Sequence, residues 1–437
     1  MSSRLVFVLL LLFCVSDARA QVPIQLTLDE AIARGLRSSH RFAEIEARRD
    51  AAQAAAEARE SAEKPLVSLQ SGYTRTNHVT EFTVPGPTGQ PRVLYPDVPD
   101  NLRTRVDLQW PIYTAGRSDA LERAARAEAD ALSQDGAAAQ ADLKLEITRA
   151  YWSVITARAS VQVLNEAVTR MEAHLQDVRN RFTVGLVPPN DVLSTEAQRS
   201  RQQMLLVQAR NLLDASTTDL RRLVGLPADA LLEIVAALEP PPPRGTAADP
   251  LVGQARADRP ERRALEIRIQ GAEERQAAAD AGRLPSLALA GGYDYARPNP
   301  KIFPRAAGWK TAWDLSVNLN WSLWDSGRLK AEVAEAAANR RAVEERLREF
   351  DQALESEVRQ RRLDLESALA AIAAAGEGVR SATEARRVVA DRFAAGVATN
   401  TDVIDAQLVL MQAELDRARA IADARLAAAR LDRALGQ

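Results

Sequence analysis

The stretch "RFTVGLVPPNDVL" spans residues 181–193, and a close copy, "RFAAGVATNTDVI", spans residues 392–404. Both open on Arg-Phe, carry a glycine four positions after the arginine, and hold Asp-Val near the end, at an offset of 211 residues. That offset is far longer than the period of about 20–50 residues that marks solenoids and propellers. The doubled phrase therefore indicates that the chain is built from two copies of one large unit.

Other parts of the two halves obey the same offset, which grows to about 220 upstream. The matched pairs are "QWPIYTAGR" (109–117) with "NWSLWDSGR" (320–328), "LRRLVGL" (220–226) with "LDRALGQ" (431–437), and "KPLVSLQSGY" (64–73) with "LPSLALAGGY" (284–293). Because loops change length more readily than helices and strands, a loop between the upstream pair and the first pair is expected to be about nine residues longer in the first half.

The chain of 437 residues divides into a leader, two repeats and a connector. The leader is predicted to be a secretory signal peptide, since Arg4 precedes a short apolar run and Ala18-Arg19-Ala20 forms an A-x-A cleavage site. Cys14 is the only cysteine and lies in this leader, so no disulfide is expected. The predicted ranges are the signal peptide (1–20), the first structural repeat (21–224), a Pro-rich connector (225–259) around "LEPPPPRGTAADP", and the second structural repeat (260–437).

Two long segments are predicted to be helical. No proline occurs between Pro111 and Pro188, or after Pro304, and both intervals are rich in Ala, Arg, Glu and Leu. A helix over 116–183 would be roughly 100 Å long at 1.5 Å per residue. Its apolar residues keep a 4-3 step from Leu143 to Phe182, and the second half repeats the step, which predicts coiled-coil packing.

Before each long helix the apolar period changes to two. In the segment from Trp313 to Leu323 every second residue is apolar and the intervening ones are polar. The pattern predicts strands near 66–84, 102–113, 285–297 and 311–324. It suits either a half-buried soluble sheet or a membrane barrel with a wet interior, and the leader favours the barrel. Four strands cannot close a barrel, so the protein must oligomerise; eight strands from a dimer would fill with side chains, whereas twelve from a trimer could leave a pore.

The order helix, two strands, long helix, turn, helix, repeated once, resembles the TolC-like outer-membrane efflux proteins. The junctions "PIYTAGR" and "LWDSGR" and the doubled phrase carry the resemblance, which covers essentially the whole mature chain. It implies a mainly α fold with a small β part: a trimeric, twelve-stranded outer-membrane barrel continued by a long α-helical coiled-coil barrel across the periplasm. It further implies an exit duct of a tripartite efflux or type I secretion system, working with a periplasmic adaptor (membrane fusion) protein and an inner-membrane transporter.

In such a fold the doubled phrase forms helical hairpins at the periplasmic tip. A left-handed glycine suits each turn, and Asn190 and Asn400 are expected to cap the next helices. The resemblance assigns the periplasmic aperture to Asp402, Asp405 and Asp191, although first-turn acids favoured by the helix dipole remain the alternative. At Ala398 the sequence departs from the arginine of the family's closing network. The residues expected to dock the adaptor are Arg181, Gly185, Leu186, Arg392, Gly396 and Val397.

Catalysis is not expected. The three histidines, His40, His78 and His174, lack metal-ligand spacing, and no phosphate-binding or dinucleotide-binding motif occurs. The prediction is therefore no enzyme, no cofactor and no bound metal. A net charge of −2 also argues against a nucleic-acid partner. The rival interpretation is a secreted coiled-coil structural or adhesive protein, which would remain soluble without a barrel.

Overall fold

The computed structural model describes residues 24–87, 89–242 and 248–437, so the predicted signal peptide lies outside the described residues. The chain forms two compact units. The first comprises residues up to 39 together with 143–245 and 363–430, and the second comprises 40–142, 246–362 and 431–437.

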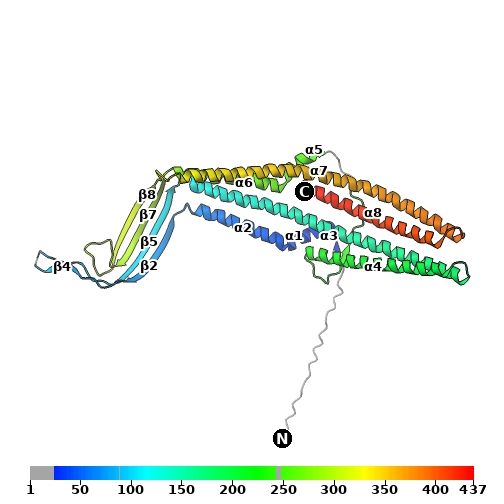
Figure 1. Cartoon of the computed structure of the whole chain (residues 1–437). Helices are drawn as coiled ribbons and strands as arrows, with labels where there is room; N and C mark the ends of the chain where they lie inside the picture. Colours follow the sequence, from blue (N-terminus) through cyan, green and yellow to red (C-terminus); the bar gives the residue numbers. More distant parts are fainter. Residues whose placement is uncertain (1–23, 88, 243–247) are drawn as a thin grey trace, which may run out of the picture. The chain divides into compact units, whose positions relative to one another are not determined.

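The elements are β1 (Ile24–Leu26), α1 (Leu28–Ser38), α2 (His40–Ser61), β2 (Leu66–Arg75), β3 (Phe82–Pro85), β4 (Pro91–Tyr95), β5 (Asp100–Tyr113), α3 (Arg117–Thr183), α4 (Pro189–Leu223), β6 (Leu232–Ile234), α5 (Ala248–Asp258), α6 (Pro260–Asp280), the 3-10 turn η1 (Ala281–Arg283), β7 (Ser286–Arg297), β8 (Lys310–Asn320), α7 (Arg328–Ala394) and α8 (Asn400–Ala434) (Figure 1).

The two halves of the chain give helices of matching length. Helices α3 and α7 each have 67 residues, and α4 and α8 each have 35. The predicted helix over 116–183 is confirmed within one residue. Most residues of its 4-3 seam are buried, Ile147, Met171 and Val178 completely, and in α7 Leu354 and Val358 are buried in the same way. Phe182 is an exception, because its side chain is exposed although the seam predicts burial.

The second unit holds a four-stranded antiparallel sheet in the order β2-β5-β7-β8 (Figure 1). Apolar side chains align in rows across all four strands on one face. One row joins Leu69, Val106, Tyr293 and Trp313, and every member of it is exposed in the single chain. The alternate positions form a polar face. The period-two pattern therefore predicted which residues share a face.

Two predicted strand ends were wrong. The strand expected over 66–84 ends at Arg75, because Val79 donates its backbone N–H to the Asp97 carboxylate (3.1 Å) instead of continuing the ladder. The chain then forms a separate hairpin, β3–β4, which accounts for the longer loop expected in the first half. The strand expected over 311–324 ends at Asn320. Just beyond it, the Trp321 indole N–H donates to the Arg283 carbonyl oxygen (3.1 Å).

The core of the first unit surrounds the middle of α3. A short parallel pair, β1 with β6, packs with α1 and α4 against Ile147, Tyr151 and Ile155. The Tyr151 hydroxyl donates to the Leu26 carbonyl oxygen (3.2 Å), so this buried phenol has a partner. Strand β6 and helix α5 both lie within the range 225–259 that was predicted as a connector.

Three pairs of glycines with positive φ lie in phrases that occur in both halves of the sequence. Each pair is separated by 211 residues: Gly116 with Gly327, Gly185 with Gly396, and Gly225 with Gly436. The first pair follows another left-handed residue at the strand-to-helix junctions, and the other two end long helices. An L side chain in this conformation costs roughly 1–2 kcal/mol. In these three phrases the duplication has preserved the glycine that the left-handed backbone requires.

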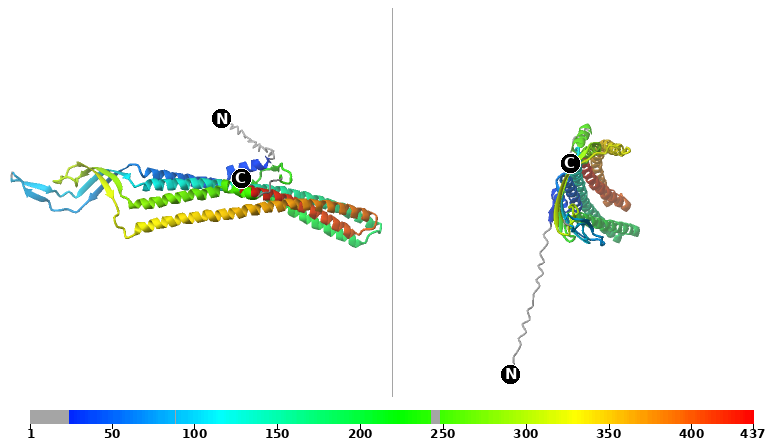
Figure 2. Two further views of the ribbon diagram at one scale, coloured as in Figure 1. Left: turned by 90° about the horizontal axis from the view of Figure 1, so that it is seen from above. Right: turned by 90° about the vertical axis from the view of Figure 1, so that its left-hand side faces the viewer.

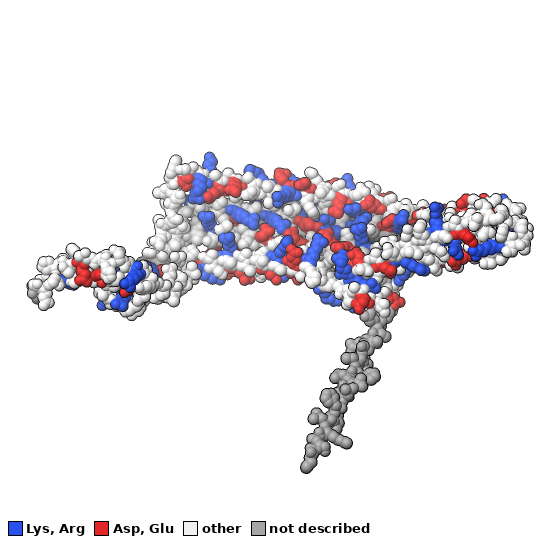
Figure 3. Space-filling view, turned by 60° about the horizontal axis from the view of Figure 1, so that its bottom comes forward, with Lys and Arg blue, Asp and Glu red and all other residues white. Residues whose placement is uncertain are grey.

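The helical surface carries charges of both signs. Figure 3 shows lysine and arginine interspersed with aspartate and glutamate over the helices, with no large patch of one sign on the visible face. Many of these residues form i, i+4 pairs, such as Arg48 with Glu44 and Arg328 with Glu332. Among the described residues, no helix combines the length and the apolar character that crossing a membrane requires.

Candidate functional site: the paired helical turns

The turn after α3 and the turn after α7 lie side by side at one end of the first unit (Figure 2). Their backbones match closely. Gly185 and Gly396 both have a φ of 77°, and both turns use the same two hydrogen bonds. The backbone N–H groups of Leu186 and Val397 donate to the carbonyl oxygens of Arg181 and Arg392, each at 2.9 Å. Those of Gly185 and Gly396 donate to the carbonyl oxygens of Phe182 and Phe393, each at 3.0 Å. This is the Schellman arrangement at a helix C-terminus.

The phenylalanines of the two turns differ in environment. Phe393 is 7% exposed and packs against Val178 of α3 and Val403 of α8, whereas Phe182 is 43% exposed. The Arg181 guanidinium lies 4.5 Å from the centre of the Phe393 ring and donates to the Phe393 carbonyl oxygen at 3.1 Å. The first turn thus clamps the second through Arg181.

Asn400 joins three helices at the centre of the site. Its side chain is 3% exposed and donates through Nδ2 to the Asp191 carbonyl oxygen (3.1 Å) and to the Thr195 hydroxyl (3.1 Å). Its Oδ1 lies 2.8 Å from Nε2 of His174. The prediction that Asn190 and Asn400 cap their helices is therefore wrong, because Asn400 points into the protein and Asn190 is exposed beside the uncapped Pro188.

The hydrogen bonds of Asn400 determine the protonation of His174. A carbonyl oxygen only accepts, so the amide nitrogen must face Asp191 and the amide oxygen must face the histidine. Nε2 of His174 consequently carries a proton. Burial lowers the pKa of His174, although the hydrogen bond that Nε2 donates to Asn400 opposes that shift. A neutral imidazole donating to Asn400 fits this buried position.

The three residues expected at the aperture have different surroundings. Asp402 accepts hydrogen bonds from the Thr399 backbone N–H (2.8 Å) and hydroxyl (2.7 Å), while its own N–H donates back to that hydroxyl (3.2 Å). Thr399 and Asp402 thus form a reciprocal cap for α8. Asp405 is exposed one turn later, and Asp191 is half-buried with its carbonyl in the Asn400 cluster.

Hydrogen bonds from the Thr399 backbone and side chain lower the pKa of Asp402, with a smaller contribution from nearby Arg392. The sequence predicts that carboxylates crowded around a symmetry axis would titrate above the ordinary range. Within one chain the shift of Asp402 is in the opposite direction. The expected rise depends on carboxylates of further copies, so it stays a prediction.

The residues expected to contact an adaptor form the outer surface of the two turns. Leu186 and Val397 are 73% and 63% exposed, and Gly185, Gly396 and Arg392 are exposed beside them. Arg181 is half-buried, since it also binds the Asp177 carboxylate (3.1 Å). Val184, 69% exposed, adds a further apolar side chain to the first turn.

Two features of the site were missed in the sequence. The Thr399–Asp402 pair carries the T-x-x-D signature of a capping box and could have been found from it. The cluster of His174, Thr195 and Asn400 has no such signal, because it depends on which helices pack together. Ala398, where the family arginine is missing, lies half-buried against the Phe393 cluster.

Comparison with known proteins identifies consistent relatives. The family described as "Outer membrane efflux protein" matches residues 31–226 and 251–437. Outer membrane protein TolC of Vibrio cholerae is 25% identical over 393 residues, covering 90% of this chain and 86% of that protein. The structure of VceC from Vibrio cholerae superposes with a TM-score of 0.76 at 21% identity, covering 94% and 96% of the two chains. The open-state MtrE outer membrane channel of Neisseria gonorrhoeae gives 0.76 at 18% identity, covering 94% and 88%.

Proposed function

The chain belongs to the outer membrane efflux protein family, and from that premise we propose that it is the trimeric outer-membrane exit duct of a tripartite efflux or type I secretion system. Three copies supply a twelve-stranded barrel, and their helices continue it as a coiled-coil barrel through the periplasm. The partners are a periplasmic adaptor (membrane fusion) protein and an inner-membrane transporter. The rival role, a secreted coiled-coil structural or adhesive protein, leaves the exposed apolar sheet face without a purpose.

The sheet is the observation that carries the proposal. Within the described part of the chain its outer strands, β2 and β8, each have one unpaired edge, and one of its faces is apolar and exposed from edge to edge. In lipid both features demand closure with other copies, since unpaired backbone groups there cost several kcal/mol each. Exposed aromatic residues lie near both ends of the strands, as in the girdles of outer-membrane barrels: Tyr73 toward one end, and Trp110, Tyr113 and Trp321 toward the other, whereas Tyr293 and Trp313 lie between them in the row of Leu69 and Val106.

Adjacent residues on opposite faces of β8 test the barrel. Val317 is 64% exposed on the apolar face, and Asn318 lies on the polar face. Val317→Arg would place a charge in lipid, at a cost that reaches about 2–4 kcal/mol at the bilayer midplane and falls toward the interfaces. Asn318→Arg faces water and is the matched control. Assembly is measured as the detergent-solubilised mass in outer-membrane extracts; a monodisperse monomer free of detergent, or equal defects in both variants, would refute the barrel.

The periplasmic mouth is proposed to be narrowed by Asp402 and Asp405, with Asp191 from the first half nearby. These two carboxylates stand three residues apart on one helix and would be multiplied by three around the axis. Rings of carboxylates favour cations in a pore. The double variant Asp402→Ala, Asp405→Ala should raise single-channel conductance in planar bilayers and weaken cation preference. Unchanged conductance and selectivity would show that Asp402 serves only as the helix cap.

The exposed surface of the two turns is proposed to bind the adaptor. Leu186→Ser and Val397→Ser should weaken co-purification with an adaptor, because each removes an exposed apolar contact while leaving the turn glycines in place. The variants should retain trimer mass and helical content. Undiminished adaptor binding by a correctly assembled double variant would exclude these turns as the docking surface.

A further inference from the structure

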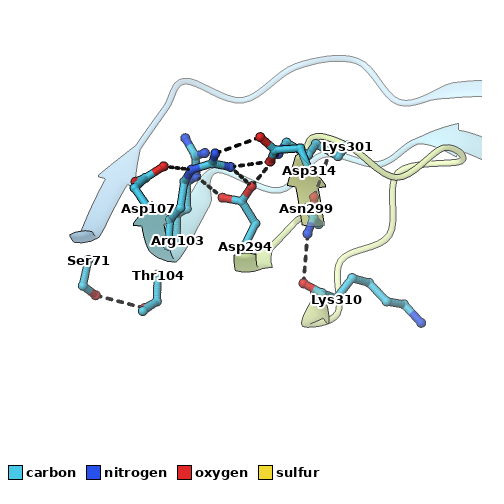
Figure 4. A network of polar contacts seen from close by, with 10 residues as sticks. Ser71, Arg103, Thr104, Asp107, Asp294, Asn299, Lys301, Lys310 and Asp314 are labelled. Atoms are coloured by element: carbon cyan, nitrogen blue, oxygen red, sulfur yellow. Dashed lines mark hydrogen bonds and ion pairs between the residues drawn. The ribbon is translucent and has the colours of Figure 1, made fainter. Parts of the chain in front are cut away.

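A charged cluster lies on the polar face of the sheet (Figure 4). Arg103, Arg105 and Asp107 project from β5, Asp294 from β7 and Asp314 from β8. Arg105 donates to all three carboxylates, at 2.6 Å to Asp107 and 3.0 Å to Asp314, and through a short contact to Asp294. Arg103 also binds Asp294, at 2.7 Å. The cluster ties three strands together.

A glycine lets Arg105 reach across the sheet. Gly292 of β7 lies between Asp107 of β5 and Asp314 of β8 in the strand register. A Cβ atom on Gly292 would collide with the Arg105 guanidinium, which lies flat over that position. The polar face therefore accommodates the Arg105 side chain because Gly292 has none, and the Arg105 guanidinium forms ion pairs with all three carboxylates.

The loop between β7 and β8 folds back over this polar face. Lys301 forms ion pairs with Asp294 and Asp314, and Asn299, 1% exposed, donates to the Lys310 carbonyl oxygen at 3.0 Å. Farther along the loop, Arg305 donates to the Asn101 side chain (3.1 Å) and to the Tyr95 hydroxyl, with its guanidinium 4.7 Å from the Tyr95 ring centre. These contacts hold the loop as an arch from β8 toward β5.

A cavity of about 390 Å³ lies under the arch. Its wall includes Gln70, Thr74, Asn101, Arg103 and Arg105 from the polar face of β2 and β5, and Arg305 from the loop. Three of these residues are arginines and none is acidic. The carboxylates of Asp107, Asp294 and Asp314 do not line the cavity, and that of Asp294 is buried.

The charges of the cluster do not balance. Three cations, Arg103, Arg105 and Lys301, form ion pairs with the three carboxylates of Asp107, Asp294 and Asp314, and Arg305 on the wall of the same cavity is a fourth cation. Arg305 supplies the excess, because within the described chain its hydrogen bonds go to Tyr95 and Asn101, which are neutral. A guanidinium with neutral partners, facing a cavity lined by amides and hydroxyls, presents the chemistry that recognises oxyanions.

We propose that this cavity binds a small soluble oxyanion, a carboxylate or phosphate monoester, between the guanidinium groups of Arg305 and Arg103. Its volume is at the lower end of the range of about 300–1,000 Å³ typical of small-molecule sites, so the ligand is a compact organic anion. A lipid phosphate is the other source of this chemistry, but the cavity opens on the polar face, opposite the apolar rows. The site stands on its own geometry and does not depend on the duct or on its partners.

The test uses the full-length protein in a phosphate-free buffer, with a detergent whose headgroup carries no phosphate. Ribose phosphate is titrated by calorimetry, with neutral ribose as the matched ligand, at constant ionic strength. The protein should bind ribose phosphate and not ribose. Arg305→Gln and Arg103→Gln should each weaken binding about tenfold or more, since each removes a charged hydrogen-bond donor. Arg305→Lys, which restores the charge, should recover part of the affinity.

Arg92→Gln is the control variant, because Arg92 is exposed on β4 and does not line the cavity. It should bind as the unaltered protein does, and circular dichroism should show all variants folded. An equal loss in Arg92→Gln would reduce the effect to unspecific charge attraction and overturn the proposal. Absence of ribose phosphate binding would also overturn it, as would binding of a short-chain phosphatidic acid alone.

Discussion

The two helical turns have the same backbone and different side-chain environments. Both close on a glycine at a φ of 77° with hydrogen bonds of equal length. Yet the second turn buries Phe393 and Asn400, while the first exposes Phe182 and Asn190. Duplication has therefore preserved the local backbone of the turn, whereas the side chains of the two copies pack differently. The first turn contributes Arg181, which contacts Phe393, and the second contributes the buried side chains of Phe393 and Asn400.

Of the residue pairs in the two turns, Phe393 and Phe182 should show the largest difference in unfolding free energy when each is replaced by alanine. Phe393→Ala removes a buried ring that packs on Val178 and under Arg181, which should cost about 3–5 kcal/mol of unfolding free energy. Phe182→Ala removes an exposed ring and should change it by no more than about 0.5 kcal/mol. Chemical denaturation followed by helical circular dichroism measures both. Similar losses would show that the two turns are packed alike in the assembled protein.

The two asparagines compare polar groups in the two turns, at positions that are one residue out of register: at the offset of 211 residues Asn400 corresponds to Pro189 and Asn190 to Thr401. Asn400→Ala leaves His174 and Thr195 buried without their partner, at a cost of about 1–3 kcal/mol. Asn190→Ala should be nearly neutral, because that side chain is exposed. Thermal unfolding of the two variants under the same conditions gives the difference. If Asn190→Ala were the more damaging variant, the first turn would be the anchored one.

The glycine pair should behave in the opposite way, with equal effects. Gly185→Ala and Gly396→Ala each force an L side chain into the left-handed region, at about 1–2 kcal/mol. Neither site has a neighbour within 4 Å of the new Cβ atom, so the cost should come from the backbone alone. Unequal shifts in the unfolding midpoint would mean that packing also distinguishes the glycines.

The contrast also marks what could be predicted from the sequence. The left-handed turns, the helix lengths and the two faces of the sheet follow from local rules: glycine spacing, the 4-3 step and alternation. The apolar seam predicts that Phe182 is buried, and the start of the next helix predicts that Asn400 caps it. Both predictions failed because burial at the turns depends on which side chain of the other hairpin lies opposite. For Phe393 those neighbours are Val178 and Arg181, which precede it by more than two hundred residues.

The helix caps provide the last and smallest contrast. Helix α8 begins with the Thr399–Asp402 pair, whereas α4 begins after Pro188 without a side-chain cap. Thr399→Ala should cost about 0.5–2 kcal/mol of unfolding free energy, and Pro188→Ala should remove no capping interaction.

The Thr399 hydrogen bonds lower the pKa of Asp402 below its unfolded value, so this carboxylate stabilises the fold above its unfolded pKa. That stabilisation fades as pH falls through the lowered folded pKa. The difference in stability between the unaltered protein and Thr399→Ala should therefore be largest near neutral pH and shrink in acid, measured by denaturation at a series of pH values. A difference that grows in acid would contradict the cap. If the ring of carboxylates proposed for the aperture dominates instead, Asp402→Asn should stabilise the trimer at neutral pH, because the repulsion between copies would exceed the lost cap.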